Sequence, residues 1–338
     1  MAARLVDVAR LAGVSPSTVS YVLSGNRPIS EETRRRVEES IAELGFRPHA
    51  GARSIRRQAT NVIAMVLPML SDGQSRVQMQ FVFAVVHAAR ARGMNLLLLT
   101  AEDGVAEINN VVGSAMVDGV IVMEVQLHDP RVPLLASIGR PAVLIGTPED
   151  PGDLVHVDFD FAAAGTMCVQ HLHDLGHRHI GFLGQSADTY AREAGYALRA
   201  RTGALEAMAD RGLAPVWSPA EATPAGVAEA IEDLFGQDPE LSALVVYNEQ
   251  ALPLVLDRLT QLDRRVPGDM SLVAICPDDQ AERLVPAVSD VALPAAELGR
   301  LAFERLAGLI AGDAQPPSTL LEPHLNRRGS GGPPPPRR

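Results

Sequence analysis

The sequence predicts an α/β protein that carries a small helical head, and three observations lead to this prediction. The first 60 residues contain three short amphipathic helices separated by turn residues. From Asn61 onward, apolar runs of strand length alternate with amphipathic helical patterns. The chain has 338 residues, of which 46% are hydrophobic, so one or two further domains with cores of their own can follow the head.

The first helix of the head is predicted to end at a sharp turn. Its apolar side is formed by Val6, Val8, Ala9 and Ala12. Gly13 is expected to end this helix, because glycine adopts the positive φ that the turn demands. Ser15 is a good N-cap, and Pro16 suits the first position of the next helix. Two helices joined in this way are typical of the helix-turn-helix, whose second helix enters the major groove of DNA.

The second and third helices complete the predicted head. The second helix is expected to turn Val19, Val22 and Leu23 inward. Its outward positions include Ser17, Thr18, Ser20 and Tyr21. The third helix has Ser30 as its cap, Val37, Ile41 and Leu44 as its inner stripe, and Gly45 as its stop. The alternative is a three-helix bundle with no DNA role, but turn and cap residues at fixed offsets favour DNA binding.

The distribution of charge agrees with a DNA-binding head. Residues 1–60 hold ten arginines and six acidic residues, a net charge of +4, whereas the whole chain carries −11 and the remainder therefore −15. A basic head on an acidic body is expected of a DNA-binding module, because its arginines neutralise phosphates.

Residues 1–60 resemble the DNA-binding head of the lactose-repressor/galactose-repressor (LacI/GalR) family of bacterial transcription regulators. The matching residues are Asp7, Val8, Ala9, Ala12, Gly13, Val14, Ser15, Thr18, Val19, Ser20, Val22, Leu23, Thr33, Val37, Ala42, Leu44, Gly45 and Pro48. The resemblance implies a helix-turn-helix domain at 1–47 and a hinge helix with linker at 48–60, which folds when two subunits meet on palindromic operator DNA. Ile55 stands where the family has a leucine that wedges into the minor groove, and isoleucine can still unstack a base step. The residues expected to contact DNA are Ser15, Pro16, Ser17, Thr18, Tyr21, Asn26, Arg53 and Ile55.

The remainder of the chain is predicted to form parallel sheets covered by helices on both faces. The predicted strands are Val62–Leu67, Asn95–Thr100, Gly119–Met123, Ala142–Ile145, Ile180–Leu183, Ala243–Tyr247 and Leu272–Ile275. The predicted helices are Val77–Arg92, Val105–Val117, Phe161–Leu175, Tyr190–Arg211, Pro224–Phe235, Gln250–Leu262 and Ala295–Ala311. Ligands of such folds bind at the carboxyl ends of strands, so we expect a site there.

The family resemblance extends over this region through the segments 117–122, 171–184, 266–275 and 320–330. It implies a core at 61–328 that resembles periplasmic sugar-binding proteins, with two subdomains joined by three crossovers and an effector between them. The first subdomain is expected at about 61–157 and 290–318, and the second at about 158–289 and 319–328. Residues 329–338, with four consecutive prolines, are predicted to be a disordered tail.

The resemblance carries over only some effector-binding residues. Asn248 and Gln250 match a polar strand-end motif in which Glu249 replaces the usual aspartate. In the family, an effector-binding arginine lies on the helix that follows the first strand of the second subdomain. Arg199 or Arg192 matches it here, and Arg199 is preferred. The predicted effector-binding residues are Asp72, Arg199, Trp217, Asn248, Gln250 and Asp278. The effector is expected to be a sugar or a related polar metabolite, and an anionic one is compatible with Arg199.

Other motifs do not indicate catalysis or a cofactor. The two cysteines, Cys168 and Cys276, lack metal-ligand spacing. The histidines at 171, 173, 177 and 179 are close in sequence, but a metal site would need convergent side chains and further ligands. Asp158 and Asp160 are interpreted as caps of the helix at Phe161 rather than as catalytic carboxylates. No GxSxG, HExxH, Walker or GxGxxG motif occurs, so an enzyme is disfavoured and no cofactor or metal is expected.

The sequence therefore predicts a cytoplasmic, effector-controlled transcription regulator, in particular a repressor, that acts as a homodimer or a dimer of dimers. The chain shows neither a signal peptide nor an apolar run of about 18 residues, so no membrane partner is expected. A solute-binding protein without enzymatic activity is the alternative, and the DNA-binding head disfavours it.

Overall fold

The protein is described by a computed structural model that defines residues 4–24, 27, 29–46, 59–68, 75–101 and 104–336. The chain forms two compact units: the head, Met1–Asn61, and the core, Val62–Arg338. No helix among the described residues combines the length and the apolar character needed to cross a bilayer.

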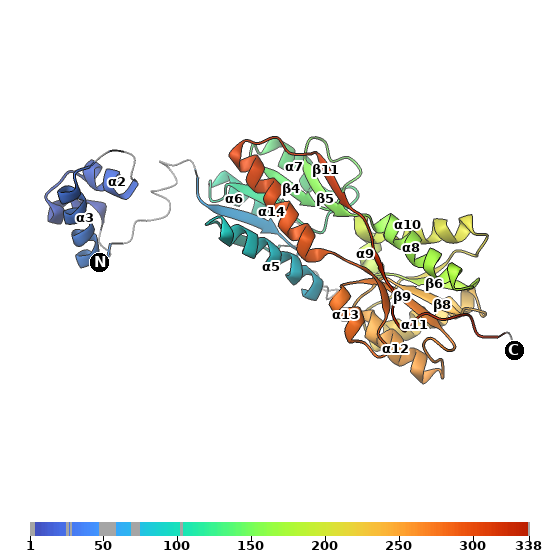
Figure 1. The fold of residues 1–338 in the computed structure, drawn as a ribbon. Helices are drawn as coiled ribbons and strands as arrows, with labels where there is room; N and C mark the ends of the chain where they lie inside the picture. Colours follow the sequence, from blue (N-terminus) through green and yellow to red (C-terminus); the bar gives the residue numbers. More distant parts are fainter. Residues whose placement is uncertain are drawn as a thin grey trace. The chain divides into compact units, whose positions relative to one another are not determined.

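The described residues of the head form three helices, α1 (Leu5–Ala12), α2 (Pro16–Ser24) and α3 (Glu31–Leu44), around an apolar core of their own (Figure 1). Gly13 ends α1 and Gly45 ends α3, both with positive φ (63° and 57°), as predicted. The buried residues of this core are Val8, Ala9, Ala12, Val19, Val37 and Phe46. Val6 does not join them: it is 52% exposed, and Leu5 packs against the core instead. Since residues on one helix face lie three or four apart, Leu5 shares its face with Val8 and Ala9.

The first subdomain of the core is built on six parallel strands in the order β11-β5-β4-β3-β1-β2. Its strands are β1 (Val62–Val66), β2 (Asn95–Leu99), β3 (Gly119–Val122), β4 (Ala142–Ile145), β5 (Val155–Phe159) and β11 (Ser318–Leu321). Two helices, α5 (Ser75–Ala91) and α14 (Ala295–Ala311), lie side by side on one face (Figure 1). The other face is covered by α6 (Val105–Gly113) and α7 (Arg131–Ser137). Because both faces are buried there, the central strands β1, β3 and β4 are continuously apolar rather than alternating.

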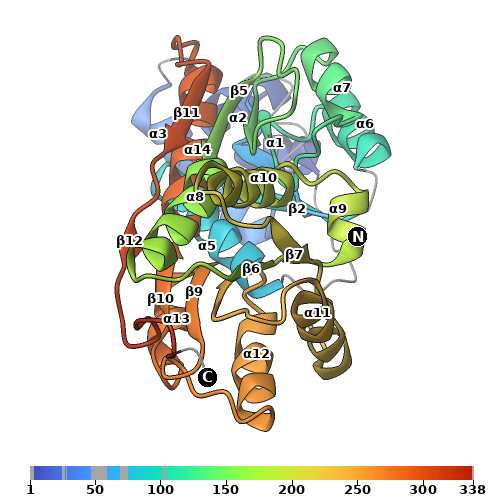
Figure 2. The same ribbon diagram turned by 90° about the vertical axis from the view of Figure 1, so that its right-hand side faces the viewer.

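The second subdomain is built on six strands in the order β12-β10-β9-β8-β6-β7, with only β12 antiparallel to its neighbour. Its strands are β6 (Ile180–Leu183), β7 (Val216–Ser218), β8 (Ala243–Val246), β9 (Ser271–Cys276), β10 (Ser289–Ala292) and β12 (Leu325–Asn326). Figure 2 shows α8 (Phe161–Asp174) and α10 (Gly195–Asp210) on one face and α11 (Pro224–Gln237) and α12 (Ala251–Gln261) on the other. Two short helices, α9 (Ala187–Ala191) and α13 (Asp278–Arg283), follow strands β6 and β9.

The chain passes between the subdomains three times, after β5, β10 and β11. Each crossing comes a few residues later than the predicted boundaries at 157, 289 and 318. Phe159 pairs with Leu321 at the end of the first sheet, and Ala292 pairs with Cys276 in the second. The predicted boundaries were approximate, because the resemblance on which they rest does not fix the residue at which each strand ends.

The prediction of a disordered tail at 329–338 is wrong for residues 329–336, which lie against the second subdomain. The Ser330 side chain is fully buried; its hydroxyl donates to the Leu272 carbonyl (2.7 Å) and accepts from the Ser289 backbone (2.8 Å). Gly332 donates from its backbone N–H to the Ser271 hydroxyl (3.0 Å). The proline-rich composition suggested disorder. However, an extended proline segment needs no hydrogen bonds of its own to be ordered when it packs against a folded domain.

Helix α10 is held unusually close to α8 by two glycines. A Cβ added at Gly165 of α8 would lie 2.2 Å from the Ala200 carbonyl oxygen, and one at Gly203 of α10 would lie 2.1 Å from that of Ala162. Only residues without a side chain fit at these two contacts. This packing fixes the position of the first turns of α10, where Tyr196 and Arg199 lie.

Candidate DNA-reading face and effector cleft

The start of α2 presents small polar side chains to solvent. Ser15, Pro16 and Ser17 are exposed and Thr18 is half-buried, whereas Val19 is fully buried and anchors the helix. The Ser15 hydroxyl accepts from the Thr18 backbone N–H (3.1 Å) and thereby caps α2. Exposed hydroxyls at a helix N-terminus are suited to contact phosphates and base edges.

Arginines of the head lie near this helix. The Arg27 guanidinium lies over the Tyr21 ring, 5.6 Å from its centroid, and α3 contributes three consecutive arginines at 34–36. Asn26, Arg53 and Ile55, together with most of the predicted hinge helix, lie outside the described residues. The DNA contacts expected of individual residues therefore stay predictions from the sequence.

The core contains a pocket lined by residues of both subdomains. The space between its lining atoms, counted out to the open mouth and including the solvent there, is about 640 Å³. The lining residues come mostly from the carboxyl ends of strands and from α5, α8, α10 and α14: Val77, Gln78, Phe81, Met123, Glu124, Val125, Ile145, Gly146, Asp158, Phe161, Gln185, Tyr196, Tyr247, Glu249, Leu293 and Leu298. A pocket at the strand ends is where the sequence predicts a ligand.

Glu124 connects the two sides of this pocket. Its Oε1 accepts from the side-chain amide of Gln78 on α5 (3.0 Å), and its Oε2 accepts from the hydroxyl of Tyr196 on α10 (3.1 Å). Its backbone has a positive φ of 52°, a conformation that costs a residue with a Cβ some free energy. Arg131 supports this turn, because its guanidinium donates to the Glu124 carbonyl (2.9 Å).

Asp158 and Arg199 form a second link between the subdomains. The Arg199 Nη1 lies 3.7 Å from the Asp158 Oδ2, and its Nη2 donates to the Thr147 carbonyl. Burial raises the pKa of Asp158 above its ordinary value, although the Phe159 N–H and the Arg199 charge act in the opposite direction. Asp160, in contrast, caps α8 by accepting from the Ala163 N–H (2.9 Å), so only one of the two aspartates interpreted as caps has that role.

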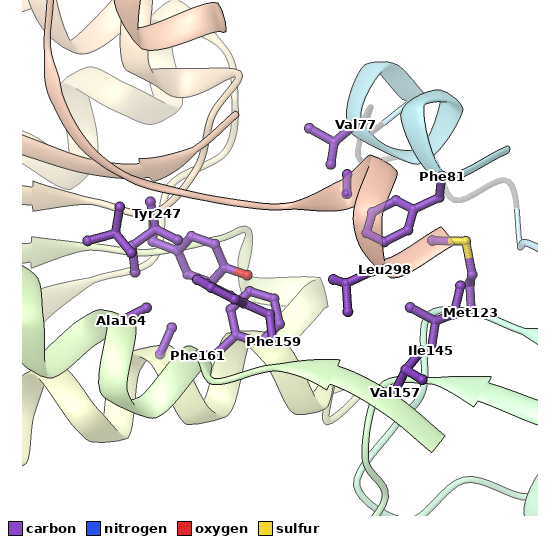
Figure 3. Packing of buried hydrophobic residues seen from close by; sticks show 14 of the residues in the cluster. Val77, Phe81, Met123, Ile145, Val157, Phe159, Phe161, Ala164, Tyr247 and Leu298 are labelled. Carbon is purple, nitrogen blue, oxygen red and sulfur yellow. The ribbon is translucent and has the colours of Figure 1, made fainter. Parts of the chain in front are cut away.

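Aromatic rings form the wall of the pocket between β5, α8, α10 and β8. Phe161 lies 6.0 Å from Tyr196 and 5.8 Å from Tyr247 between ring centroids, and the two tyrosines are 6.4 Å apart. Figure 3 shows Tyr247 and Phe161 together on one side, and Phe81, Leu298 and Met123 on the other. Burial raises the pKa of Tyr247 well above its ordinary value, so its hydroxyl stays protonated near neutral pH.

None of the predicted effector residues that the structure describes lines this pocket; Arg199 meets it only through Asp158. Asn248 is buried and holds its own subdomain together, donating to the Ala220 carbonyl (2.9 Å) and accepting from the Ala251 N–H (3.2 Å). Trp217 lies against the Arg201 guanidinium, 4.5 Å from its ring centroid. Asp278 binds Arg328 and Asn326, and Gln250 is the N-cap residue of α12. Asp72 lies outside the described residues.

Sequence reasoning missed Glu124, Gln185, Tyr196, Tyr247 and Glu249. Glu124, Gln185 and Glu249 lie within strand-end segments that the sequence does indicate. The register of the motif around 248–250 led to Asn248 and Gln250, but the side chain between them is the one that reaches the pocket.

Two of the clustered histidines, His177 and His179, have structural partners. His177 is fully buried and lies 2.8 Å from the Ser242 hydroxyl through Nδ1, and 3.0 Å from the Gly332 carbonyl through Nε2. His179 pairs with Asp238 and Glu240. Among the described residues, no group of three or more His, Cys, Asp or Glu side chains is arranged to hold a metal ion.

Comparison with known proteins identifies the family to which this architecture belongs. Residues 4–49 match the model of bacterial regulatory proteins of the lacI family, and residues 169–331 match that of the periplasmic binding protein-like domain. The chain is 28% identical, over 96% of its own length and 97% of the other's, to the HTH-type transcriptional regulator CelR of Thermobifida fusca. The chain belongs to the lacI family.

Two solved structures show how closely the chain follows the lacI family fold. A complex of the transcriptional regulator CelR with cellobiose is 27% identical and covers 97% of this chain and 100% of its own, with a TM-score of 0.71. The lac repressor dimer bound to operator and the anti-inducer ONPF has a TM-score of 0.83, with 22% identity over 98% of this chain and 99% of its own, and supports the fold. The head and the two-subdomain core are both parts of this lacI family architecture.

Proposed function

We propose that this lacI family protein represses transcription by binding a palindromic operator as a homodimer, and that a small molecule in the cleft between its subdomains controls that binding. The observation that carries the proposal is the pocket itself, because its lining joins both subdomains. The Tyr196–Glu124 link lies within that lining, and the Arg199–Asp158 link lies beside it. The CelR complex with cellobiose and the operator complex of the lac repressor support both halves of the proposal.

The cleft provides a physical route for control. A ligand among Glu124, Asp158 and Tyr196 would change the contacts that set how the subdomains close. It shifts operator affinity only by its difference in affinity for the two closure states, typically about 1–3 kcal/mol. A stand-alone solute-binding protein would use the same cleft but has no use for the helical head, so the head favours the regulator.

Footprinting on the upstream DNA of the gene tests the DNA-binding half. One recognition helix alone buries too little surface for operator affinity, so two heads should protect a site with two-fold symmetry. The match to a transcriptional regulator leads us to expect no catalytic turnover and action in the cytoplasm, where the DNA is. Protection of one unsymmetric half-site by a monomer would contradict the proposal.

A further inference from the structure

The pocket between the subdomains is rich in aromatic rings, and this bears on the chemical class of its ligand. Four of its sixteen described lining residues are aromatic, whereas aromatic residues make up 4% of the chain. The chain has eight Phe, four Tyr and one Trp, so nearly a third of its aromatic side chains meet at this one site. An enrichment of this kind favours a ligand that is recognised through contacts with rings.

Three of these rings form one wall of the pocket, the aromatic wall. Phe161 begins α8, Tyr196 lies in the first turn of α10, and Tyr247 directly follows β8. Their ring centroids lie 6.0, 5.8 and 6.4 Å apart, with angles of 48°, 37° and 85° between the ring planes. Since the rings touch one another and come from three separate elements, the fold itself sets the shape of this wall.

The opposite wall is apolar as well. It includes Phe81 of α5, Leu298 of α14 and Met123, which directly follows β3. Figure 3 shows these three side chains on the other side from Phe161 and Tyr247. A ligand in the pocket is therefore covered by apolar side chains on two sides, which is favourable for an apolar face and costly for a hydroxyl.

The polar residues of the lining have partners within the protein. Glu124, for example, accepts hydrogen bonds from Gln78 (3.0 Å) and from Tyr196 (3.1 Å). The same holds for the other residues with carboxylate or amide side chains in the described lining, which are Asp158, Gln185 and Glu249. Because the protein itself supplies partners for these residues, the apolar walls are the part of the pocket that a ligand would contact most.

We infer that the cleft binds a small molecule with an apolar ring system, aromatic or alicyclic, held between the aromatic wall and the opposite wall. This rests on the proposed function, since it names the ligand class of the same cleft. A ring without hydroxyls on its faces gains free energy as both faces leave water. A sugar ring of the same size would have to press several hydroxyls against carbon, where they lose the hydrogen bonds that water made with them.

Ring compounds that match in size but differ in hydroxyl content test this inference on the full chain. We would measure calorimetric titration and thermal shift with cyclohexanol against myo-inositol, benzyl alcohol against glucose, and 2-naphthol against cellobiose. At least one compound with an apolar ring should bind about tenfold or more tightly than its polyhydroxyl counterpart. Its binding should also show a negative change in heat capacity, because apolar surface is buried.

One variant from each wall shows whether both walls contact the ligand. Phe81→Leu and Phe161→Leu keep an apolar side chain but remove a ring, so each should weaken binding of the ring compound about threefold or more. Tyr247→Leu replaces the second variant if that one does not fold. The matched control is Phe83→Leu, because Phe83 also lies on α5 but is 58% exposed and is not part of the lining. The control should keep the full affinity, and an equal loss in the control, or no loss in either wall variant, would overturn the inference.

Operator binding, measured by gel shift on the same preparations, separates the two proposals. If the protein binds operator but every polyhydroxyl compound binds as well as its apolar counterpart, or if no apolar ring compound binds, the inference about the ring is overturned and the proposed function stands. If the apolar ring compounds bind but no operator is bound, the ligand class stands and the proposed function fails.

Discussion

At the scale of single residues, Arg199 is, with Tyr196, one of the side chains through which α10 reaches the first subdomain. It pairs with the buried Asp158 and donates to the Thr147 carbonyl, both across the cleft. Because these partners belong to the core alone, changing Arg199 should affect closure of the cleft without altering the head's contacts with DNA.

We therefore predict that Arg199→Ala keeps operator affinity but loses most of the effector response, and lowers core stability by about 2 kcal/mol, because Asp158 is left buried without its partner. Gel shifts with and without effector, and urea unfolding, measure these effects. Arg201→Ala is the control, because Arg201 lies on the same helix but stacks on Trp217 and Tyr190. An undiminished effector response of Arg199→Ala would show that the ion pair has no part in control.

A second residue-scale prediction concerns His177. The Gly332 carbonyl can only accept, so Nε2 carries a proton; in the neutral ring Nδ1 then accepts from the Ser242 hydroxyl. Burial lowers the pKa of His177 below its ordinary value of about 6.5. The unfolded chain therefore binds a proton that the folded chain resists, and stability falls as the pH drops below about 6.5.

His177→Ala should lower the free energy of unfolding by about 2–4 kcal/mol through a cavity and unpaired hydroxyls, and flatten its decline in acid. Urea unfolding at a pH above and a pH well below about 6.5 measures both effects. His87→Ala provides the comparison, because His87 is exposed on α5. If the free energy of unfolding of the His177 variant falls as steeply in acid as that of the wild type, other groups cause the fall.

At the scale of elements, two irregular segments clasp the subdomains together. The segment after β3 and the segment before α10 form an isolated antiparallel bridge at Gln126 and Ala194. His128 lies between the carboxylates of Glu193 (2.8 Å) and Glu149 (2.7 Å) and extends this clasp at the surface. Positive φ values at Glu124 (52°) and Glu193 (55°) show that both segments hold unusual turns.

We predict that this clasp depends on pH. Hydrogen bonding and charge from Glu193, then from Glu149, raise the pKa of His128. The two ion pairs are therefore complete below about pH 6.5 and are lost as the pH rises through the raised pKa. Effector affinity should change across that range in the wild type, and the His128→Gln variant should lack this component.

Calorimetric titrations with the effector over a pH series measure the change. His179→Gln is the matched control: His179 also lies between two carboxylates, Asp238 (2.8 Å) and Glu240 (3.1 Å), but all three belong to the second subdomain. If the His128→Gln variant has the same pH profile of effector affinity as the wild type, the prediction that His128 makes the clasp pH-dependent is wrong.

The sequence predicted six interior strands and the edge strand β2, but it missed the interior strands β5 and β10 and the edge strands β7, β11 and β12. β1, β3, β4, β6, β8 and β9 are nearly continuous apolar runs, as is typical of parallel strands buried on both faces. β5 and β10 are buried too, but polar residues such as Asp158 and Asp290 interrupt their apolar pattern. β7, β11 and β12 are short or partly exposed edge strands, so their sequences carry little apolar signal. The predicted helix 190–211 is two pieces, because the turn at Glu193 that forms the clasp interrupts it.

The candidate cleft was predictable in its location but not in its members. Strand ends are found from the strands, and most of the lining comes from them. Tyr196 and Phe81 come from helices, and only the packing of α10 on α8 and of α5 beside α14 brings them to the cleft. Such contacts join residues far apart in the chain, so they cannot be predicted from a pattern in neighbouring residues of the sequence.

At the scale of the whole molecule, the division of charge between head and body sets how the protein meets DNA. The basic head, at +4 over residues 1–60, attracts the duplex, whereas the remainder, at −15, is repelled by it. Only the head should therefore exchange counterions with the phosphates.

We predict that operator affinity falls steeply and linearly with rising salt on a logarithmic plot, and that binding to unrelated DNA falls in parallel but from a weaker starting point. Fluorescence anisotropy with labelled operator and scrambled duplexes over a salt series measures both lines. Arg35→Gln in α3 changes the head charge by one and should shift both lines; Arg300→Gln in α14 is the control and should shift neither. An operator affinity that does not change with salt would contradict binding through contacts between the arginines and the phosphates.

The late position of β11 and β12 in the chain has a consequence for synthesis. Each sheet takes an edge strand from the last 21 residues, 318–338, and Ser330 and Gly332 dock only after both strands have been made. On the ribosome the head, with its own apolar core, emerges whole while both halves of the core still wait for their final strands. A polypeptide that stopped before residue 318 would therefore have the head but lack an edge strand in each sheet of the core, so control by an effector should require residues 318–332 as well as the head.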